Sequence, residues 1–291
     1  AEQMLCALEE IKAEKIYISA DGAREDIEGE IKKCELTKKR FLDGITWPCK
    51  VSTNFKKENL GCKRGVVDAI DWFFKHEKYG NILEDDCIPN RCFFEFTEKL
   101  LKRYENEDRV WMISGDNSAD IVLEDKNTYS FVRDPIIWGW ATWRSTWNKY
   151  DIDMKQWREI RDGPNAKKIF INKDQYKQLS DDYDKCMKGE IDTWDYQLSA
   201  AMKINNGLCI IPRVNLIKNI GFGENATHTN EVTERSNKNT EEIGKILFNK
   251  EIKIDAKAEK QIMKKIQGIE GENKILKKIK ATITEKIRWH N

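Results

Sequence analysis

Three acidic residues follow directly on a short apolar run in the segment NILEDDCIP. Ile82-Leu83 is succeeded by Glu84, Asp85 and Asp86. Adjacent carboxylates repel one another, and a cation lying among them offsets that cost. Carboxylate oxygens are the ligands that hard divalent ions such as Mg²⁺ and Mn²⁺ prefer. The segment therefore predicts a metal site, with an acidic turn after a strand as the alternative.

Acidic residues also follow two other predicted strands. A strand at residues 15–20 ends at Asp21-Gly22, and a strand at residues 110–114 ends at Gly115-Asp116. Strands alternate with helices over the first 115 residues, which is typical of a doubly wound, mostly parallel sheet. Ligands of such sheets bind beyond the carboxyl ends of the strands. We therefore expect Asp21, Glu84–Asp86 and Asp116 to lie along one edge.

The chain has neither a GxGxxG after a strand nor a GxxxxGK[ST] segment, so the two commonest phosphate-binding loops are absent from it. A metal ion would then have to hold any bound diphosphate.

The remaining elements of this half are predicted from apolar spacing. They are a first helix with Met4, Leu5, Leu8 and Ile11 on one face, a helix at 24–38, a strand at 45–51, a helix from Val66 to His76 and a helix at 92–104.

The composition limits the class of protein. The 291 residues carry a net charge of +1, which argues against binding nucleic acid through a positive field. Ten Trp and eleven Phe supply a large core. The eight Cys and three His show no zinc-ligand spacing. Dispersed Cys are typical of a reduced, cytoplasmic protein, with an oxidised, secreted protein as the alternative.

Tryptophans are concentrated in residues 129–147. Trp140, Trp143 and Trp147 have helical spacing, which predicts that part of the segment is core. Trp138-Gly139 fits a helix poorly, because a glycine there allows the backbone to approach another group closely. Aromatic faces near a loop also bind sugar rings, so both packing and ligand contact stay open for Trp138 and Trp140.

Two later segments carry polar residues suited to a site. Asp195, in TWDYQ, opens a predicted helix, where the helix dipole favours a carboxylate and capping is the alternative to catalysis. Two short strands predicted in 207–220 lead into NIGFGENATHT, which contains His228. This loop is too polar and glycine-rich to be core, and a histidine there is either solvated or in contact with a ligand.

The C-terminal part has a different composition. From about residue 240 it is rich in Lys, Ile and Glu, and isoleucines recur every four residues from Ile275 to Ile287. This pattern predicts a basic amphipathic helix that docks on the domain, with an anionic membrane surface as the alternative. We expect a domain at 1–235, a basic helical extension at 236–291, and a cytoplasmic location or one at the inner face of the membrane.

The chain resembles bacterial glycosyltransferases of the GT-A fold, distantly similar to N-acetylglucosaminyltransferase I. The resemblance rests on ISADG, NILEDDCIP with FFEF, WGWATWRSTW, TWDYQ and NIGFGENATHT in that order, up to about residue 230. It implies a mostly parallel central sheet flanked by helices. It also implies transfer of a sugar from a nucleotide-diphosphate donor, UDP-linked by resemblance, to a glycan or lipid-linked acceptor.

The resemblance also implies roles for individual residues. Asp86 would bind Mn²⁺ or Mg²⁺, and Asp195 would be the general base. Asp21 would contact the nucleotide base, with Gly22 beside it, and Asp85 would lie near the ribose. Glu84 would lie near the donor sugar, and His228 near the diphosphate. Gly139 and Trp140 would line the pocket for donor and acceptor.

This chain departs from the family pattern at two places. Its acidic motif is Glu-Asp-Asp, and it lacks the apolar first strand and Asn-Arg-Pro-like turn that bind the nucleotide in the family. We therefore expect a fold without its first strand. A metal-dependent nucleotidyltransferase and a non-catalytic carbohydrate-binding protein that uses the tryptophans are the alternative functions.

Overall fold

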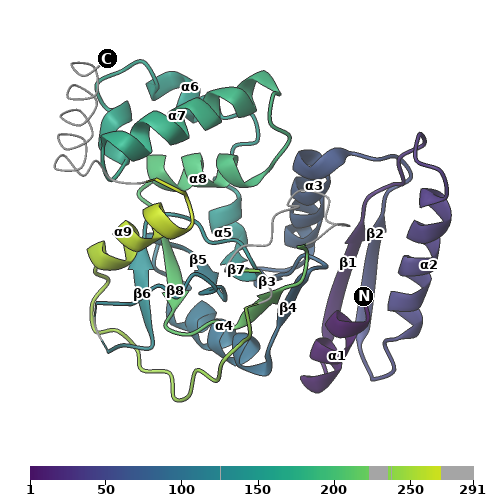
Figure 1. Cartoon of the computed structure of the whole chain (residues 1–291). Helices are drawn as coiled ribbons and strands as arrows, with labels where there is room; N and C mark the ends of the chain where they lie inside the picture. The colour runs from purple at the N-terminus through teal and green to yellow at the C-terminus, as the bar shows by residue number, and fades with distance from the viewer. Residues whose placement is uncertain (125, 223–234, 237, 270–291) are drawn as a thin grey trace, which may run out of the picture.

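The computed structural model describes residues 1–124, 126–222, 235–236 and 238–269, which form an α/β arrangement (Figure 1). The strands are β1 (Lys15–Ala20), β2 (Lys50–Phe55), β3 (Tyr79–Ile82), β4 (Cys87–Pro89), β5 (Val110–Ser114), β6 (Tyr129–Val132), β7 (Trp140–Trp143), β8 (Leu208–Pro212) and β9 (Ile217–Asn219). The helices are α1 (Glu2–Glu10), α2 (Glu30–Asp43), α3 (Gly61–His76), α4 (Arg91–Arg103), α5 (Arg144–Trp147), α6 (Lys155–Ile160), α7 (Lys173–Lys188), α8 (Asp195–Ile204) and α9 (Ala256–Lys265).

The central sheet is mixed, so the expectation of a mostly parallel sheet is wrong. Its strand order is β3-β7-β5-β8-β6, and only β5 and β8 are parallel neighbours. The cause is β7, which pairs antiparallel with both β3 and β5. Two antiparallel pairings in succession leave β3 and β5 running in the same direction. The carboxyl ends of β3 and β5 therefore do share one edge of the sheet.

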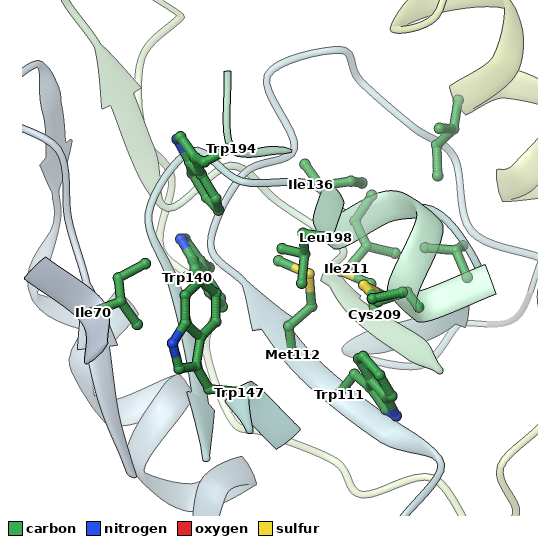
Figure 2. Close-up of a cluster of buried hydrophobic side chains, with 14 of the residues drawn as sticks. Ile70, Trp111, Met112, Ile136, Trp140, Trp147, Trp194, Leu198, Cys209 and Ile211 are labelled. Carbon is green, nitrogen blue, oxygen red and sulfur yellow. The ribbon is translucent and has the colours of Figure 1, made fainter. Parts of the chain in front are cut away.

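The tryptophan segment contains a strand as well as a helix. Trp140 and Trp143 lie in β7, and Trp147 ends the one-turn helix α5. The indole rings of Trp194 and Trp140 are stacked, with centroids 5.7 Å apart, and Trp147 lies below Trp140 at 6.2 Å (Figure 2). This column joins β7, α5 and the start of α8. The aromatic core therefore fixes where α8 begins, and so where Asp195 lies.

Two smaller sheets lie outside the central one. β1 and β2 pair in parallel, and β4 pairs antiparallel with β9. α2 begins at Glu30 rather than 24, after Gly29 in the left-handed region (φ 76°). β2 begins at Lys50 rather than 45, because Pro48 has no amide N–H to give a partner strand and Trp47 turns inward to donate to the Ala13 carbonyl at 3.0 Å.

Residues 238–269 are built into the body. Ala258 and Ile262 of α9 belong to the same buried cluster as Trp111 and Met112. Arg133 and the buried Glu259 form an ion pair at 2.7 Å. The described part of the expected extension is thus integral to the core, whereas the predicted helix from Ile275 to Ile287 lies outside the described residues. None of the described helices is both long enough and apolar enough to cross a membrane.

Candidate functional site

Two carboxylates from distant parts of the chain meet at the N-terminus of α3. Asp21, directly after β1, accepts hydrogen bonds from the backbone N–H groups of Leu60 at 2.9 Å and Gly61 at 3.1 Å. Asp192 accepts one from the Cys62 N–H at 3.0 Å. The positive end of the helix dipole stabilises both. Asp21 is thereby oriented by α3, and its expected contact with a nucleotide base stays a prediction.

Gly22 is the point where the loop after β1 touches the loop before α3. A Cβ at this position would lie 2.3 Å from the carbonyl carbon of Glu58. The Gly22 N–H donates to the Glu58 carbonyl at 3.2 Å, and the Asn59 side chain donates to the Gly22 carbonyl at 2.8 Å. Only glycine permits this approach, so the role of Gly22 in the structure is to fix Asp21 against α3.

Glu84 follows β3 and faces the same region. Its side chain is half-buried, and burial followed by the charges of Asp86, Asp85 and Asp195 raises its pKa to about 7. Asp85 is exposed to solvent. Ile82 at the end of β3 pairs with Trp140, and Trp140 stacks on Trp194, which directly precedes α8, so the start of α8 and the end of β3 are neighbours although they are more than a hundred residues apart in sequence. The structure thus brings together two of the predicted site residues.

Asp86 is held between β4 and the loop that follows β9. A Cβ on Gly221 would lie 2.0 Å from Oδ2 of Asp86, so the loop backbone rests directly on the carboxylate. The Cys87 thiol donates to Oδ1 of Asp86 at 3.3 Å, and the Ile220 N–H donates to the Asp86 carbonyl at 2.9 Å. Burial raises the pKa of Asp86, and Asp85 adds to that effect. The predicted metal ligand therefore has a fixed position.

Asp195 is the first residue of α8, at the positive end of that helix. The Thr193 hydroxyl donates to its Oδ1. Burial, and then the charges of Glu84, Asp192 and Asp195, raise the pKa of the Cys62 thiol to about 11. The Cys62 N–H is bonded to Asp192, and Cys62 packs against the same buried cluster as Ile82, two residues before Glu84, and Trp194, directly before Asp195. The sequence reasoning missed both Cys62 and Asp192, and no single motif contains the pair.

The burial of Trp140 contradicts its expected contact with the donor, whereas the donor contact expected for Gly139 stays a prediction. Gly139 has φ 62°, and a Cβ there would lie 2.4 Å from Cδ1 of Ile217, so the group that it approaches closely is a core side chain. Trp140 is 1% exposed and has no surface to offer a sugar. Trp138 is half-buried, and the Arg235 guanidinium lies 4.0 Å from its ring centroid.

The third acid of the predicted edge has a different environment. Asp116 is 1% exposed and forms an ion pair with Arg235 at 2.9 Å. Within the described residues, by contrast, no Lys, Arg or His forms an ion pair with Asp21, Glu84–Asp86, Asp192 or Asp195. Asp116 is thus neutralised by Arg235, whereas the other acids have no such partner among the residues that the structure describes. His228 lies outside the described residues.

A divalent ion fits these residues if a single carboxylate is its protein ligand. Across residues 1–269, with the gaps given above, no three His, Cys, Asp or Glu side chains are arranged to hold a metal. Mg²⁺ is commonly bound through one or two carboxylates together with substrate phosphates and water, so it needs no such cage. Asp86 fits the role of a single ligand because its position is fixed and no cation of the described chain is paired with it.

Comparison with known proteins gives no relative for this site. No family model matches the chain, and no curated protein is significantly similar to it. The site is therefore interpreted from its own residues, their contacts and their charges.

Proposed function

We propose that this protein is a metal-dependent glycosyltransferase that moves a sugar from a nucleotide-diphosphate donor, UDP-linked, to an acceptor hydroxyl in the synthesis of a surface polysaccharide or glycan. One observation carries the proposal. Carboxylates from the ends of β1 and β3 and from the start of α8 converge near the N-terminus of α3, without an ion-pair partner among the described residues. Such a gathering of anions is suited to a cation that in turn binds a diphosphate.

The proposed reaction divides the work between two acids. Asp86 would hold Mn²⁺ or Mg²⁺, and that ion, when bound, neutralises charge on the leaving diphosphate. Asp195 would accept the proton of the attacking hydroxyl, with its carboxylate oriented by the Thr193 hydroxyl. One base on the side opposite the leaving group corresponds to a single displacement with inversion. The half-buried Glu84 would border the sugar.

The two alternative functions differ in what they require. A non-catalytic carbohydrate-binding protein would use the tryptophan cluster as a platform, but Trp140, Trp143 and Trp147 are all buried. A nucleotidyltransferase would use the same carboxylates and would release pyrophosphate from a nucleoside triphosphate and a sugar phosphate, but no UDP from a UDP-sugar. Incubation with UDP-sugars, with and without Mn²⁺, separates these functions, because a transferase releases UDP and free or transferred sugar.

Asp195→Asn tests the base. We expect turnover to fall by about 10²–10⁴-fold, because the amide cannot accept the proton, whereas donor binding is retained. The matched control is Asp192→Asn, whose carboxylate lies near the same helix terminus but is already bonded to the Cys62 N–H. The turnover of both variants is measured as the steady-state rate of UDP release. An Asp195→Asn protein that is as active as the parent protein would exclude Asp195 as the base.

Alkylation of Cys62 tests the metal without relying on activity. Because its pKa is about 11, the rate should rise roughly tenfold for each pH unit between 7 and 10. Mn²⁺ with UDP should lower this pKa and speed alkylation at a fixed pH, whereas the exposed Cys6 should be unaffected. The acceleration should disappear in Asp86→Ala. An equal acceleration in Asp86→Ala would show that the ion is bound elsewhere.

A further inference from the structure

A cleft of about 510 Å³ lies at the opposite edge of the central sheet from the candidate site. Its walls are the C-terminal end of α4, the turn that leads into β5, and residues 249–252. β5 begins at Val110, directly after this turn, and ends at Ser114, two residues before Asp116. A strand of five residues spans roughly 16 Å, so the cleft and the carboxylates beyond the strand ends are separate places in the molecule.

The buried core holds the two long walls of the cleft together. Residues 249–252 belong to the segment that precedes α9 and passes beside β6 (Figure 1). The hydroxyl oxygens of Tyr104, at the end of α4, and Tyr129 of β6 are 2.6 Å apart, and both side chains are buried. The backbone N–H of Asn249 donates to the Tyr129 hydroxyl at 3.1 Å. The cleft is therefore preformed and does not depend on a loop closing over it.

Hydrogen-bonding groups at this wall are incompletely used. One of the two tyrosine hydroxyls donates to the other, so the proton of the remaining hydroxyl has no acceptor among the hydrogen bonds of the described chain. The side-chain amide of Asn249 also lacks a partner among the described residues, and its Oδ1 is buried. Polar groups in this state are usually completed by a ligand or by water. The wall thus offers both a donor and an acceptor.

The charges around the cleft are unequally paired. Arg109 forms two hydrogen bonds with Glu107, from Nε to Oε1 at 2.8 Å and from Nη2 to Oε2 at 3.0 Å. The guanidinium of Arg103 lies 5.2 Å from the ring centroid of Phe248. Neither Arg103 nor Lys250 forms an ion pair with any described residue. The cleft therefore contains two cations that are free to bind an anion.

A simple anion would not use all of these groups. Glu251 lines the cleft beside Lys250 and would repel a bare phosphate or carboxylate. Its carboxylate and the amide of Asn249 are instead suited to hydroxyl groups, since a carboxylate only accepts and an amide both donates and accepts. A molecule that fits the cleft should therefore carry one anionic group together with hydroxyls.

We propose that this cleft binds an anionic sugar, that is, a monosaccharide unit that carries a carboxylate or a phosphate group. Arg103 and Lys250 would bind the anionic group, because a guanidinium forms paired hydrogen bonds with carboxylate and phosphate alike. Asn249 and Glu251 would bind the ring hydroxyls. The cleft volume is within the range of small-molecule sites and accommodates one sugar ring with its substituent.

Titration calorimetry on the whole chain, without added metal, tests the proposal with five probes: glucuronate, glucose-6-phosphate, glucose, acetate and inorganic phosphate. One of the two anionic sugars should bind at least roughly tenfold more tightly than glucose and than its simple anion, because it alone fills both kinds of contact. Tighter glucuronate would identify the carboxylate as the anionic group, and tighter glucose-6-phosphate the phosphate. A smaller preference for both sugars, or no binding, would overturn the proposal.

Two arginines of α4 offer a matched pair of variants that locates the binding. Arg103→Gln should weaken binding of the preferred sugar at least roughly tenfold, because charge-assisted hydrogen bonds are lost. Arg91→Gln makes the same change at the first residue of the same helix and should leave binding unchanged. Both side chains are exposed, so neither substitution disturbs the core. Equal binding by the two variants would place the sugar elsewhere and overturn the proposal.

Asn249→Ala tests whether the cleft recognises hydroxyls. It removes the amide but keeps the backbone N–H that bonds to Tyr129. The preference for the anionic sugar over its simple anion should fall, while binding of the simple anion stays the same. An unchanged preference would overturn the assignment of a sugar. Because these titrations contain neither a nucleotide sugar nor a metal, binding here without UDP-sugar turnover would refute the glycosyltransferase proposal alone.

Discussion

The central sheet and the β1–α2–β2 unit are stabilised very differently. Every residue of β5, β6, β7 and β8 is buried. In the N-terminal unit, Ile16 is the one buried strand residue, at 8% exposed, and α2 buries none of its side chains. Buried apolar area is the main source of stability, so the central sheet should be the more stable of the two.

The difference matters because the candidate site lies where the two regions meet. Asp21 comes from the N-terminal unit, whereas Glu84, Asp86 and Asp195 come from the body. Apolar residues of α2 stay exposed, Ile31 at 63% and Leu36 at 46%. One wall of the site is therefore carried by the region with the smaller core. The N-terminal unit should therefore unfold locally before the central sheet does. Such local unfolding should change the distance between Asp21 and Glu84.

Paired core truncations give the largest expected contrast. Phe131→Ala in β6 removes a fully buried ring and should cost about 3–5 kcal/mol. Ile31→Ala on α2 should change the free energy of unfolding by no more than about 0.5 kcal/mol. Urea denaturation followed by tryptophan fluorescence measures both. A large cost for Ile31→Ala would show that another surface covers α2.

The charge of Glu84 should make stability depend on pH. Its pKa rises from 4.5 to about 7 on folding, so the native state binds the proton more tightly and stability falls as pH rises from about 4.5 through 7. Glu84→Gln should remove this slope and be more stable than the parent protein by up to about 3 kcal/mol at pH 8. The two proteins should be equally stable at pH 4. If stability depends on pH in Glu84→Gln as it does in the parent protein, the dependence arises from another titratable group.

Gly22→Ala should have a local effect, confined to the N-terminal unit. The new Cβ would meet the backbone of Glu58 and Asn59, which cannot yield as a side chain would, at a cost of about 1–3 kcal/mol. Exchange should speed up in β1 and β2 and stay unchanged in β5. Gly163→Ala, whose Cβ would have its nearest neighbour at 3.3 Å, is the control. Equal acceleration in β5 would mean that the two regions unfold together.

Local periodicity was enough to predict several elements. β1, β5 and the short strands β8 and β9 lie where the apolar runs indicate, and α3 ends at His76 as expected. The direction of β7 could not be predicted, because strand orientation depends on partners distant in the sequence. Trp140, Trp143 and Trp147 have a spacing that suits a helix, and a strand followed by a single helical turn reproduces it.

The site shows the same division between local and distant information. Asp21, Glu84 and Asp195 stand out because each follows a strand or opens a helix. Asp192 does not stand out, since its partner is the Cys62 N–H, 130 residues away. The choice between packing and ligand contact for Trp140 could not be made from the sequence, because burial depends on what the fold stacks above the ring, here Trp194.

The return of α9 into the core has a consequence for synthesis of the chain. Ala258 and Ile262 close the cluster that contains Trp111 and Met112. Hydrophobic clusters joined over such sequence separations form slowly and stay open to wrong contacts until the last segment arrives. During translation, the interior of the sheet is sealed only after α9 has emerged. A nascent chain released near residue 250 would present that interior to chaperones and proteases.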